Sequence, residues 1–282
     1  MRYTYLTIIG LVLISFSCHS NQGKAEQVQE SQTSQDSIQH DGIYPFQYDG
    51  FEMWTLQDKV NTMSMKLFPE ADPAIVSQLV PNGEAPAAIN TFLIKRNGQY
   101  ILFDAGLGEN NGGALLRHLK ALGIQPSDIN AVCITHFHGD HIGGMVSNGK
   151  ANFPNAQIYF SEKEQKAWSN DENTRKMLAA YKDRTHAFAD DAIILDGIIT
   201  KPAPGHTPGH TLFQIGNVLI IGDLLHAAAL QLPHPEYCAR YDQDKPTAVK
   251  TRQTFYKYVE DNNLIVAGMH LPQSGVLENL QQ

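Results

Sequence analysis

Cysteine is scarce in this sequence, with three residues among 282. One of them, Cys18, lies close to the N-terminus, which leaves Cys133 and Cys238 in the rest of the chain. Two cysteines are too few for the disulfide framework that holds small secreted domains together. Cys133 lies within an apolar run, where a thiol usually serves as a small core side chain. We therefore assign neither cysteine a functional role.

Basic residues are also few, since 21 Lys and Arg stand against 29 Asp and Glu and the formal net charge is −8. No cluster of basic residues could follow a phosphate backbone, so we expect no nucleic-acid partner. The length of 282 residues is sufficient for one sizeable hydrophobic core. These features favour a globular domain that acts on a small molecule.

Long apolar runs are rare, and the clearest one covers residues 6–16, shortly before Cys18. It is short for crossing a bilayer but has the length of a signal-peptide core. With Ser17 before Cys18, residues 1–18 resemble a bacterial lipoprotein signal, in which the cysteine is the lipidation site. An ordinary cleaved secretory signal is the alternative. Either signal predicts an exported protein, and the first predicts a periplasmic lipoprotein that contacts a membrane only through its N-terminal lipid.

The segment that follows, residues 19–41, is rich in Gln, Ser and Glu and has almost no large apolar residues. Such a composition cannot bury enough surface to offset the entropy lost on ordering. We expect a disordered linker there and a single folded domain over residues 42–282.

Turn residues divide the folded part into short elements. The pairs Asn97-Gly98, Asp196-Gly197 and Gly216-Asn217 each separate two apolar runs, which is typical of β-hairpins. Asp72 followed by Pro73 predicts a helix N-terminus. Ser161 with Glu164 has the pattern of a capping box, which opens a helix carrying Trp168.

The remaining apolar runs complete the expected set of elements. Strands are predicted over residues 51–56, 91–95, 99–103, 131–134 and 264–267, and helices over residues 73–79, 114–122, 171–182 and 246–260. Hairpins among strands that alternate irregularly with helices indicate an α+β fold, with two mixed sheets packed face to face and helices outside.

The strongest chemical signal is the segment from Thr135 to His141, which reads THFHGDH. Its potential ligands are His136, His138, Asp140 and His141, and all four follow directly after an apolar run. Imidazole and carboxylate groups are ligands that Zn²⁺ and similar ions accept. A polar loop with coincidental histidines is the plain alternative, but four such residues at this spacing favour a metal site.

Three other apolar runs also end at an acid or an imidazole, namely Asp104, Asp223 and His270. Ionised groups are excluded from strand interiors by the cost of desolvation, so they collect where strands end. We therefore expect these residues at one shared sheet edge. The Gly- and Pro-rich segment PGHTPGH adds His206 or His210, and the spacing alone does not decide between them.

The order HxHxDH, GHTPGH, GD and a late His resembles the ligand series of the metallo-β-lactamase superfamily, over a region from about residue 43 to the end. This resemblance implies the superfamily's four-layer αβ/βα fold. It also implies that His136, His138 and His206 bind one ion, that Asp140, His141 and His270 bind another, and that Asp223 bridges both. Asp104 would orient the metal ligands without binding a metal itself. His210 would be a structural residue.

Asp223 makes the chain resemble branches of the superfamily other than the β-lactamases, because the β-lactamases lack a bridging Asp at this point. Segments such as residues 88–93, 135–145, 153–155, 222–231 and 270–272 are similar to methyl parathion hydrolase and the related acyl-homoserine lactonases. An extension over roughly residues 42–85, which shapes the pocket mouth, also fits that subgroup. One type of homoserine lactonase has a Tyr three residues after the bridging Asp, where this chain has His226.

The resemblance implies a cofactor of two divalent metal ions, most often Zn, with Mn, Co and Fe as alternatives. A bridging hydroxide would attack the substrate, and Asp140 would accept its proton and pass it to the leaving oxygen. Phe137 and Trp168 are candidates for lining an apolar substrate pocket. Core packing is an equally good interpretation of Trp168 and the better one for Phe188. We read His118, His186 and His234 as surface residues.

Two substrate classes fit such a centre. The first is lactones, such as acyl-homoserine lactones, and related esters, which would be opened by hydrolysis. The second is aryl phosphotriesters. Glyoxalase II is disfavoured because it carries a helical region after the last ligand, and an RNA nuclease is disfavoured by the acidic charge. A non-enzymatic metal-binding scaffold is a further alternative. The resemblance also implies a homodimer.

Overall fold

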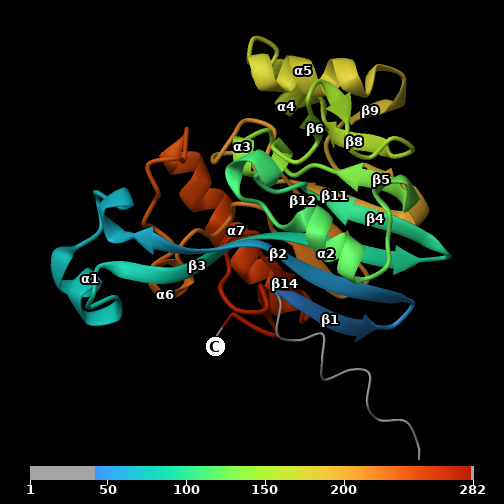
Figure 1. The fold of residues 1–282 in the computed structure, drawn as a ribbon. Coiled ribbons are helices and arrows are strands. Elements are labelled where there is room, and N and C mark those ends of the chain that lie inside the picture. The colour runs from blue at the N-terminus through green and yellow to red at the C-terminus, as the bar shows by residue number, and fades with distance from the viewer. Residues whose placement is uncertain (1–41, 281–282) are drawn as a thin grey trace, which may run out of the picture.

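The computed structural model describes residues 42–280, so the signal segment, Cys18 and the linker over residues 19–41 lie outside the described residues. Two β-sheets form the centre of the molecule (Figure 1). In spatial order, the seven-stranded sheet consists of β1 (Ile43–Tyr48), β2 (Phe51–Ser64), β3 (Glu84–Arg96), β4 (Gln99–Phe103), β5 (Ile129–Cys133), β8 (Gln157–Ser161) and β9 (Thr185–Phe188). The six-stranded sheet consists of β10 (Ile193–Ile194), β11 (Ile198–Pro202), β12 (Thr211–Ile215), β13 (Val218–Ile220), β14 (Ile265–Ala267) and β15 (Val276–Leu277).

A two-stranded hairpin, β6 (Val146–Ser147) with β7 (Lys150–Ala151), stands apart from both sheets. The α-helices are α1 (Pro73–Leu79), α2 (Leu115–Ala121), α3 (Gly139–Ile142), α4 (Glu162–Ala167), α5 (Glu172–Ala180), α6 (Ala228–Gln231) and α7 (Lys245–Asn262). Short 3-10 helices are η1 (Met65–Leu67), η2 (Glu109–Asn111), η3 (Pro126–Asp128), η4 (Lys182–Arg184) and η5 (Leu195–Gly197). Among the described residues, no helix combines the length and apolar character that a membrane crossing requires.

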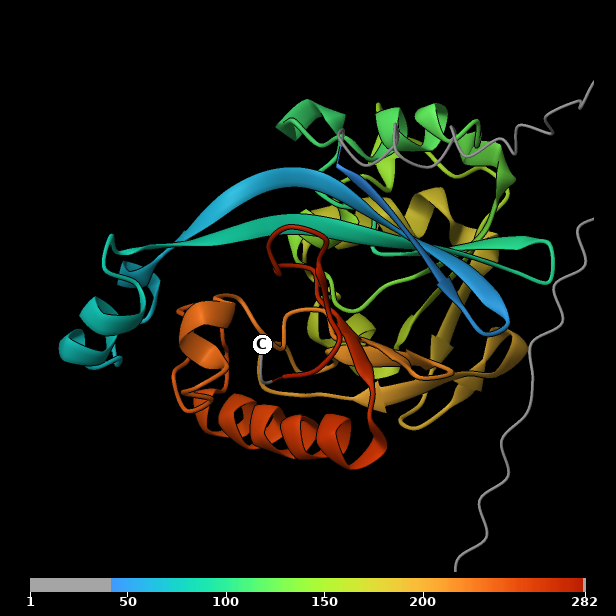
Figure 2. The ribbon, with the colours of Figure 1, turned by 90° about the horizontal axis from the view of Figure 1, so that it is seen from below.

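The central strands are buried on both faces, which explains their nearly continuous apolar sequences. In β5, Ala131 and Cys133 point into the core between the two sheets, whereas Val132 points to the opposite face. Helix α2 covers that outer face, and α7 covers the outer face of the six-stranded sheet through Phe255. Figure 2 shows α7 below the sheets and α2 above them. The predicted four-layer α+β architecture is therefore confirmed.

The hairpins predicted at Asn97-Gly98, Asp196-Gly197 and Gly216-Asn217 are all present. Asn97 and Gly98 both adopt positive φ angles, as a two-residue hairpin turn requires. The predicted first strand was too short, because β1 precedes it and β2 continues to Ser64. His118 was expected at the surface but is 3% exposed, since it shares the buried face of α2 with Leu119.

The long β2 and β3 strands carry η1 and α1 away from the sheet as an arm, which Figure 2 shows clearly. Apolar residues of this arm, including Phe68 and Val80, pack against Leu230 of α6. The backbone N–H of Arg240 donates to Leu67 O at 2.8 Å. The arm therefore lies beside the loop that connects α6 with α7.

The capping box predicted at Ser161 was half wrong. Ser161 is the N-cap of α4, and its hydroxyl accepts a hydrogen bond from Lys163 N at 3.2 Å. Glu164 does not return to the N-cap backbone. Its carboxylate instead accepts hydrogen bonds from Phe137, Thr207 and Gly209, which belong to two distant loops. The local pattern predicted that Glu164 would cap the helix, but its side chain makes tertiary contacts instead.

Candidate metal centre

The ligand candidates lie where parallel strands of the two sheets end. Asp104 follows β4 and His136 follows its parallel neighbour β5, whereas Asp223 and His270 follow the parallel pair β13 and β14. The expectation of one shared sheet edge was therefore wrong, because two strands come from each sheet. The two edges lie at the same end of the sandwich, and His136 Nε2 is 3.7 Å from Asp223 Oδ2.

Three imidazoles and one carboxylate form the first group, which consists of His136, His138, His206 and Asp223. His138 Nδ1 is 2.9 Å from both His136 Nε2 and His206 Nε2, and the last two atoms are 3.2 Å apart. Ligand nitrogens around a tetrahedral Zn²⁺ are about 3.3 Å apart, given metal–nitrogen distances of about 2.0–2.1 Å. The spacing of these nitrogens therefore fits a shared cation.

The second group consists of Asp140, His141 and His270. Asp140 approaches His141 Nε2 at 3.8 Å and His270 Nε2 at 3.6 Å. Asp223 lies between the groups, because its Oδ1 is 3.0 Å from His141 Nε2 and its Oδ2 is 3.2 Å from His206 Nε2. All seven predicted ligands are thus brought together, with Asp223 at the shared position.

Two buried atoms support the fit to a pair of cations. Among the described residues, His141 Nε2 and Asp223 Oδ1 are buried without a hydrogen-bond partner. Such groups are costly to bury unless something satisfies them. A cation between the Nε2 and Oδ1 atoms would satisfy both. The donor set contains nitrogen and oxygen only, so it suits Zn and also Mn, Co or Fe.

Burial and neighbouring charges set the protonation of these groups in the metal-free protein. Burial, together with the nearby His206, lowers the pKa of His138 to about 4. Burial also lowers the pKa of His206, but the carboxylates of Asp223 and Asp242 outweigh it and raise that pKa to about 9. The pKa of Asp223 lies well below its usual value, because His141 and other histidines overcome the effect of burial. Asp223 is therefore ionised at neutral pH.

Buried oxygen atoms hold the other nitrogen of several ligand rings. His141 Nδ1 is 2.6 Å from Asp104 Oδ2, and His270 Nδ1 is 3.0 Å from the carbonyl oxygen of Ala88. Because a carboxylate or carbonyl oxygen can only accept, each Nδ1 carries a proton, and Nε2 is the ring nitrogen that would bind a cation. Asp104 is itself fixed by the backbone N–H and hydroxyl of Thr135.

A corresponding anchor for His206 was not predicted from the sequence. His206 Nδ1 is 3.0 Å from Asp242 Oδ1, and Arg252 Nη2 donates to Asp242 Oδ2 at 3.3 Å. Arg252 is 1% exposed on α7 and also donates to the carbonyl oxygen of Leu224. Asp242 lies in a loop with no apolar periodicity or motif, so no sequence signal marked it. An arginine among the buried positions of an otherwise amphipathic helix was the only available hint.

Two further histidines lie close to the ligands. His210 is outside the ligand groups, because its Nδ1 faces Ala203 O at 3.1 Å and its Nε2 accepts from Asp223 N at 3.0 Å. His226 is 1% exposed, with Nε2 3.3 Å from Asp223 Oδ2 and its ring stacked on that of His270. Within the described residues, neither ring nitrogen of His226 has a hydrogen-bond partner.

The two aromatic pocket candidates differ in position. The indole of Trp168 is half-buried and meets His138 edge-on, with ring centroids 5.2 Å apart. Phe137 was wrongly assigned to the pocket, because it is 2% exposed in the core and packs against Phe160. The side chains alternate in direction along the segment between β5 and α3. His136 and His138 therefore face the ligand cluster, while Phe137 faces away from it. Phe188 is also a core residue, as expected.

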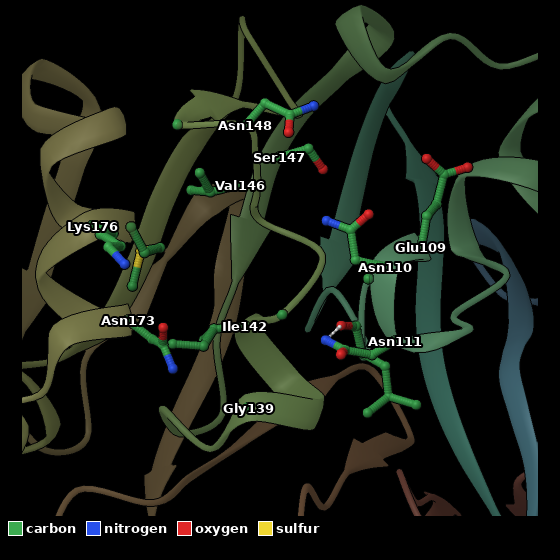
Figure 3. A pocket seen from close by; sticks show the side chains of 15 residues that line it. Glu109, Asn110, Asn111, Gly139, Ile142, Val146, Ser147, Asn148, Asn173 and Lys176 are labelled. Carbon is green, nitrogen blue, oxygen red and sulfur yellow. Dashed lines mark hydrogen bonds between the residues drawn. The ribbon is translucent and has the colours of Figure 1, made fainter.

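A cavity of about 450 Å³ is lined in part by Gly139 and Ile142 of α3. Figure 3 shows Glu109, Asn110 and Asn111 on one wall, and Asn173 and Lys176 on the opposite wall. Gly139 also lines it and stands in the sequence between the candidate ligands His138 and Asp140. A cavity lined by both polar and apolar residues, including Ile142 and Met177, thus begins one residue in the sequence from two candidate ligands.

Two solved structures illustrate what this chain is similar to. The hydrolase AbOPH of the beta-lactamase superfamily is 28% identical, with a TM-score of 0.78, over 83% of this chain and 92% of its own. AidC, a dizinc quorum-quenching lactonase solved with the product N-hexanoyl-L-homoserine, is 26% identical, with a TM-score of 0.75, over the same shares of the two chains.

Sequence comparison adds a more distant relative, YobT of Bacillus subtilis, which is uncharacterised. It is 24% identical over 147 residues, which make up 48% of this chain and 61% of YobT. The match therefore spans less than two thirds of that relative. The model of the metallo-beta-lactamase superfamily matches residues 85–265, which include all the candidate ligands except His270. Together with the two-sheet fold and the convergent histidines and aspartates, this match shows that the chain belongs to the metallo-beta-lactamase superfamily.

Proposed function

We propose that this protein is a metal-dependent hydrolase that opens lactones of the acyl-homoserine lactone type or cleaves related esters. The observation that carries the proposal is the convergence of seven ligands into two groups that share the carboxylate of Asp223. The similarity to AidC, a dizinc lactonase, supports the choice of lactones. Zinc is the proposed metal, and the small-molecule substrate is the proposed partner.

Two divalent ions held there would lower the pKa of a water molecule and polarise the substrate oxygen. The residues around them supply the proton transfers. Asp140 is 29% exposed, more than the buried Asp223, so it can reach both solvent and substrate. Burial raises the pKa of Asp140, but His141 and His270 outweigh it and keep the pKa below the usual value. Asp140 is therefore an ionised acceptor for the proton of the attacking water.

His226 is the proposed donor to the substrate oxygen. Burial holds its pKa below the usual value, so the imidazole is neutral and carries one N–H. Its Nε2 lies 3.3 Å from Asp223 Oδ2, at the position where one type of homoserine lactonase has a Tyr. An N–H donor at this position would stabilise the negative charge that develops during attack on the carbonyl.

The test is hydrolysis of acyl-homoserine lactones of increasing chain length and of one aryl phosphotriester, with metal content measured on the same sample. We expect about two ions per chain and a clear preference for lactones. Asp140→Asn should lower kcat by about 100-fold or more, the usual range for loss of a general base. His234→Gln, which changes a partly exposed histidine outside the ligand groups, is the control and should retain full activity.

Phosphotriester hydrolysis is the second candidate, favoured by the similarity of several segments to methyl parathion hydrolase. A higher catalytic efficiency on the phosphotriester would establish it in place of the lactonase. Two bound ions without either activity would exclude both substrate classes. Less than one ion per chain would favour a non-enzymatic scaffold instead.

A further inference from the structure

Glu164 is a buried acid that the proposed reaction does not use. It lies on α4 and is 0% exposed. Its Oε1 accepts from Phe137 N at 3.0 Å, and its Oε2 accepts from Thr207 Oγ1 at 2.8 Å and from Gly209 N at 2.9 Å. Both carboxylate oxygens thus accept hydrogen bonds, and none of the donors belongs to α4.

The three donors belong to the two loops that carry the three imidazoles of the first ligand group. Phe137 stands between His136 and His138, and Thr207 directly follows His206. These loops are distant in the sequence, yet His136 Nε2 and His206 Nε2 are 3.2 Å apart. Glu164 therefore joins two loops whose relative position sets the spacing of three imidazoles.

The contact between α4 and the loop that carries His206 is tight as well as polar. A Cβ atom on Gly209 would lie 2.1 Å from Glu164 N, so only glycine allows the loop this close to the helix. The same helix ends at Trp168, whose ring meets His138 edge-on. Helix α4 thus contacts both ligand loops through Glu164 and contacts His138 through its C-cap residue Trp168.

Burial of a carboxylate without a cationic partner carries a large desolvation cost. Burial raises the pKa of Glu164, and the hydrogen bonds from Phe137, Thr207 and Gly209 partly offset this effect. The exposed Glu162 on the same helix bears no such cost. A costly buried charge with three donors on ligand loops indicates a role in fixing those loops.

We propose that Glu164 is a positioning residue that fixes the spacing of His136, His138 and His206 and so sets the cation affinity of that group. The effect is selective, because the second group, Asp140, His141 and His270, receives no hydrogen bond from Glu164. The proposal rests on the metal centre proposed above but not on its substrate.

The experiment is a titration of the metal-free full-length protein with Co²⁺ against a competing chelator, monitored by visible absorption. Glu164→Gln places an amide N–H₂ against N–H and O–H donors and so disturbs the two loops. The ion held by His136, His138 and His206 should therefore bind about 10–100-fold more weakly. The absorption band of that ion should shift, while the affinity of the other ion stays unchanged. Glu162→Gln is the matched control and should leave both ions unaffected.

A second variant keeps the test decisive if Glu164→Gln does not fold. Thr207→Val preserves side-chain shape and removes one donor, and it should weaken the same ion by a smaller factor. In the double variant the two effects should be less than additive, because the residues share one contact.

Unchanged affinity and an unchanged Co²⁺ spectrum in Glu164→Gln would overturn the proposal, as would equal weakening of both ions. Failure of the unmodified protein to bind two ions would overturn the metal centre itself. Normal binding of two ions without hydrolysis of any ester would reject the proposed function and leave the role of Glu164 standing.

Discussion

Three of the five candidate ligand histidines are each held through the ring nitrogen that does not face the cluster. Asp104 holds His141, Asp242 holds His206, and the carbonyl oxygen of Ala88 holds His270. Among these anchors, Asp242 is itself paired with a buried arginine, Arg252. This pair connects α7 with a candidate ligand on the adjoining loop.

Replacement of Asp242 tests this connection. In Asp242→Asn the amide oxygen can still accept from His206, but the negative charge opposite Arg252 is lost. We expect about 10–100-fold weaker metal binding. A loss of about 3–5 kcal/mol in the free energy of unfolding should accompany it, because a buried charge is left unpaired. Competition with a chelator and urea unfolding would measure the two effects.

The control is Asp261→Asn, which removes an exposed carboxylate on α7 that pairs with Lys257. Exposed pairs contribute about 0–1 kcal/mol, so this variant should resemble the parent. If Asp242→Asn were as stable and bound metal as tightly as Asp261→Asn, the anchoring role of Asp242 would be refuted.

Trp168 offers a second test at the scale of one residue, since it lies between core and site. Its indole is half-buried and contacts His138. If it lines the substrate pocket, Trp168→Ala should raise KM by about tenfold through loss of apolar contact area, with little change in kcat. Steady-state kinetics would decide, and Phe188→Leu, a change in the core, should leave KM unaltered.

Two helices hold the loop that carries His206. Gly209 packs on α4, and a Cβ atom on Gly205 would lie 2.3 Å from Ala248 N at the start of α7. Gly205 also has a φ of +128°, a conformation that residues with side chains rarely adopt. The loop is therefore held by helices that belong to opposite outer layers of the fold.

Gly205→Ala should push the loop away from α7 and strain its backbone. We expect a loss of about 2–4 kcal/mol in the free energy of unfolding, together with weaker metal binding. Gly98→Ala is the matched control, because Gly98 also has a positive φ but open space around it. That variant should lose only about 1–2 kcal/mol and should bind metal normally. Similar results for both variants would show that the contact with α7 has no effect on the site.

At the scale of the whole molecule, the convergence of the two sheet edges couples folding, protonation and metal binding. In the metal-free protein, His206 has a pKa of about 9, raised by Asp223 and Asp242 against the effect of burial. A cation can bind only after that proton has left. Metal affinity should therefore rise with pH up to about 9.

The stability of the metal-free protein should change with pH in the opposite direction to the metal affinity. The folded-state pKa of His206 lies above the unfolded value of about 6.5, so its contribution is complete below pH 6.5 and declines as pH rises toward 9. The Tm of metal-free protein should fall over this range, whereas that of metal-loaded protein should not.

Calorimetric titration at pH 7 in buffers of different ionisation enthalpy would count the protons that leave. A binding enthalpy that is independent of the buffer would contradict the raised pKa of His206. Differential scanning calorimetry of the metal-free and metal-loaded forms would test the prediction for Tm.

The sequence by itself determined most of the local structure and the identity of the ligand candidates. Hairpins at Asn97-Gly98 and Gly216-Asn217, the cap at Asp72 and the ends of the apolar runs all depend on neighbouring residues. His136, His138, Asp140 and His141 were recognisable because one tight turn supplies all four.

Only the tertiary structure decided how these parts meet. It placed Asp104 and His136 on one sheet and Asp223 and His270 on the other. It assigned Phe137 to the core, and it gave Glu164 and Asp242 partners that lie 27 to 45 residues away in the sequence. A side chain's partner across the fold depends on the packing of whole sheets and helices. No local pattern of residues encodes that distance, which is why the ligands could be predicted while the residues that hold them could not.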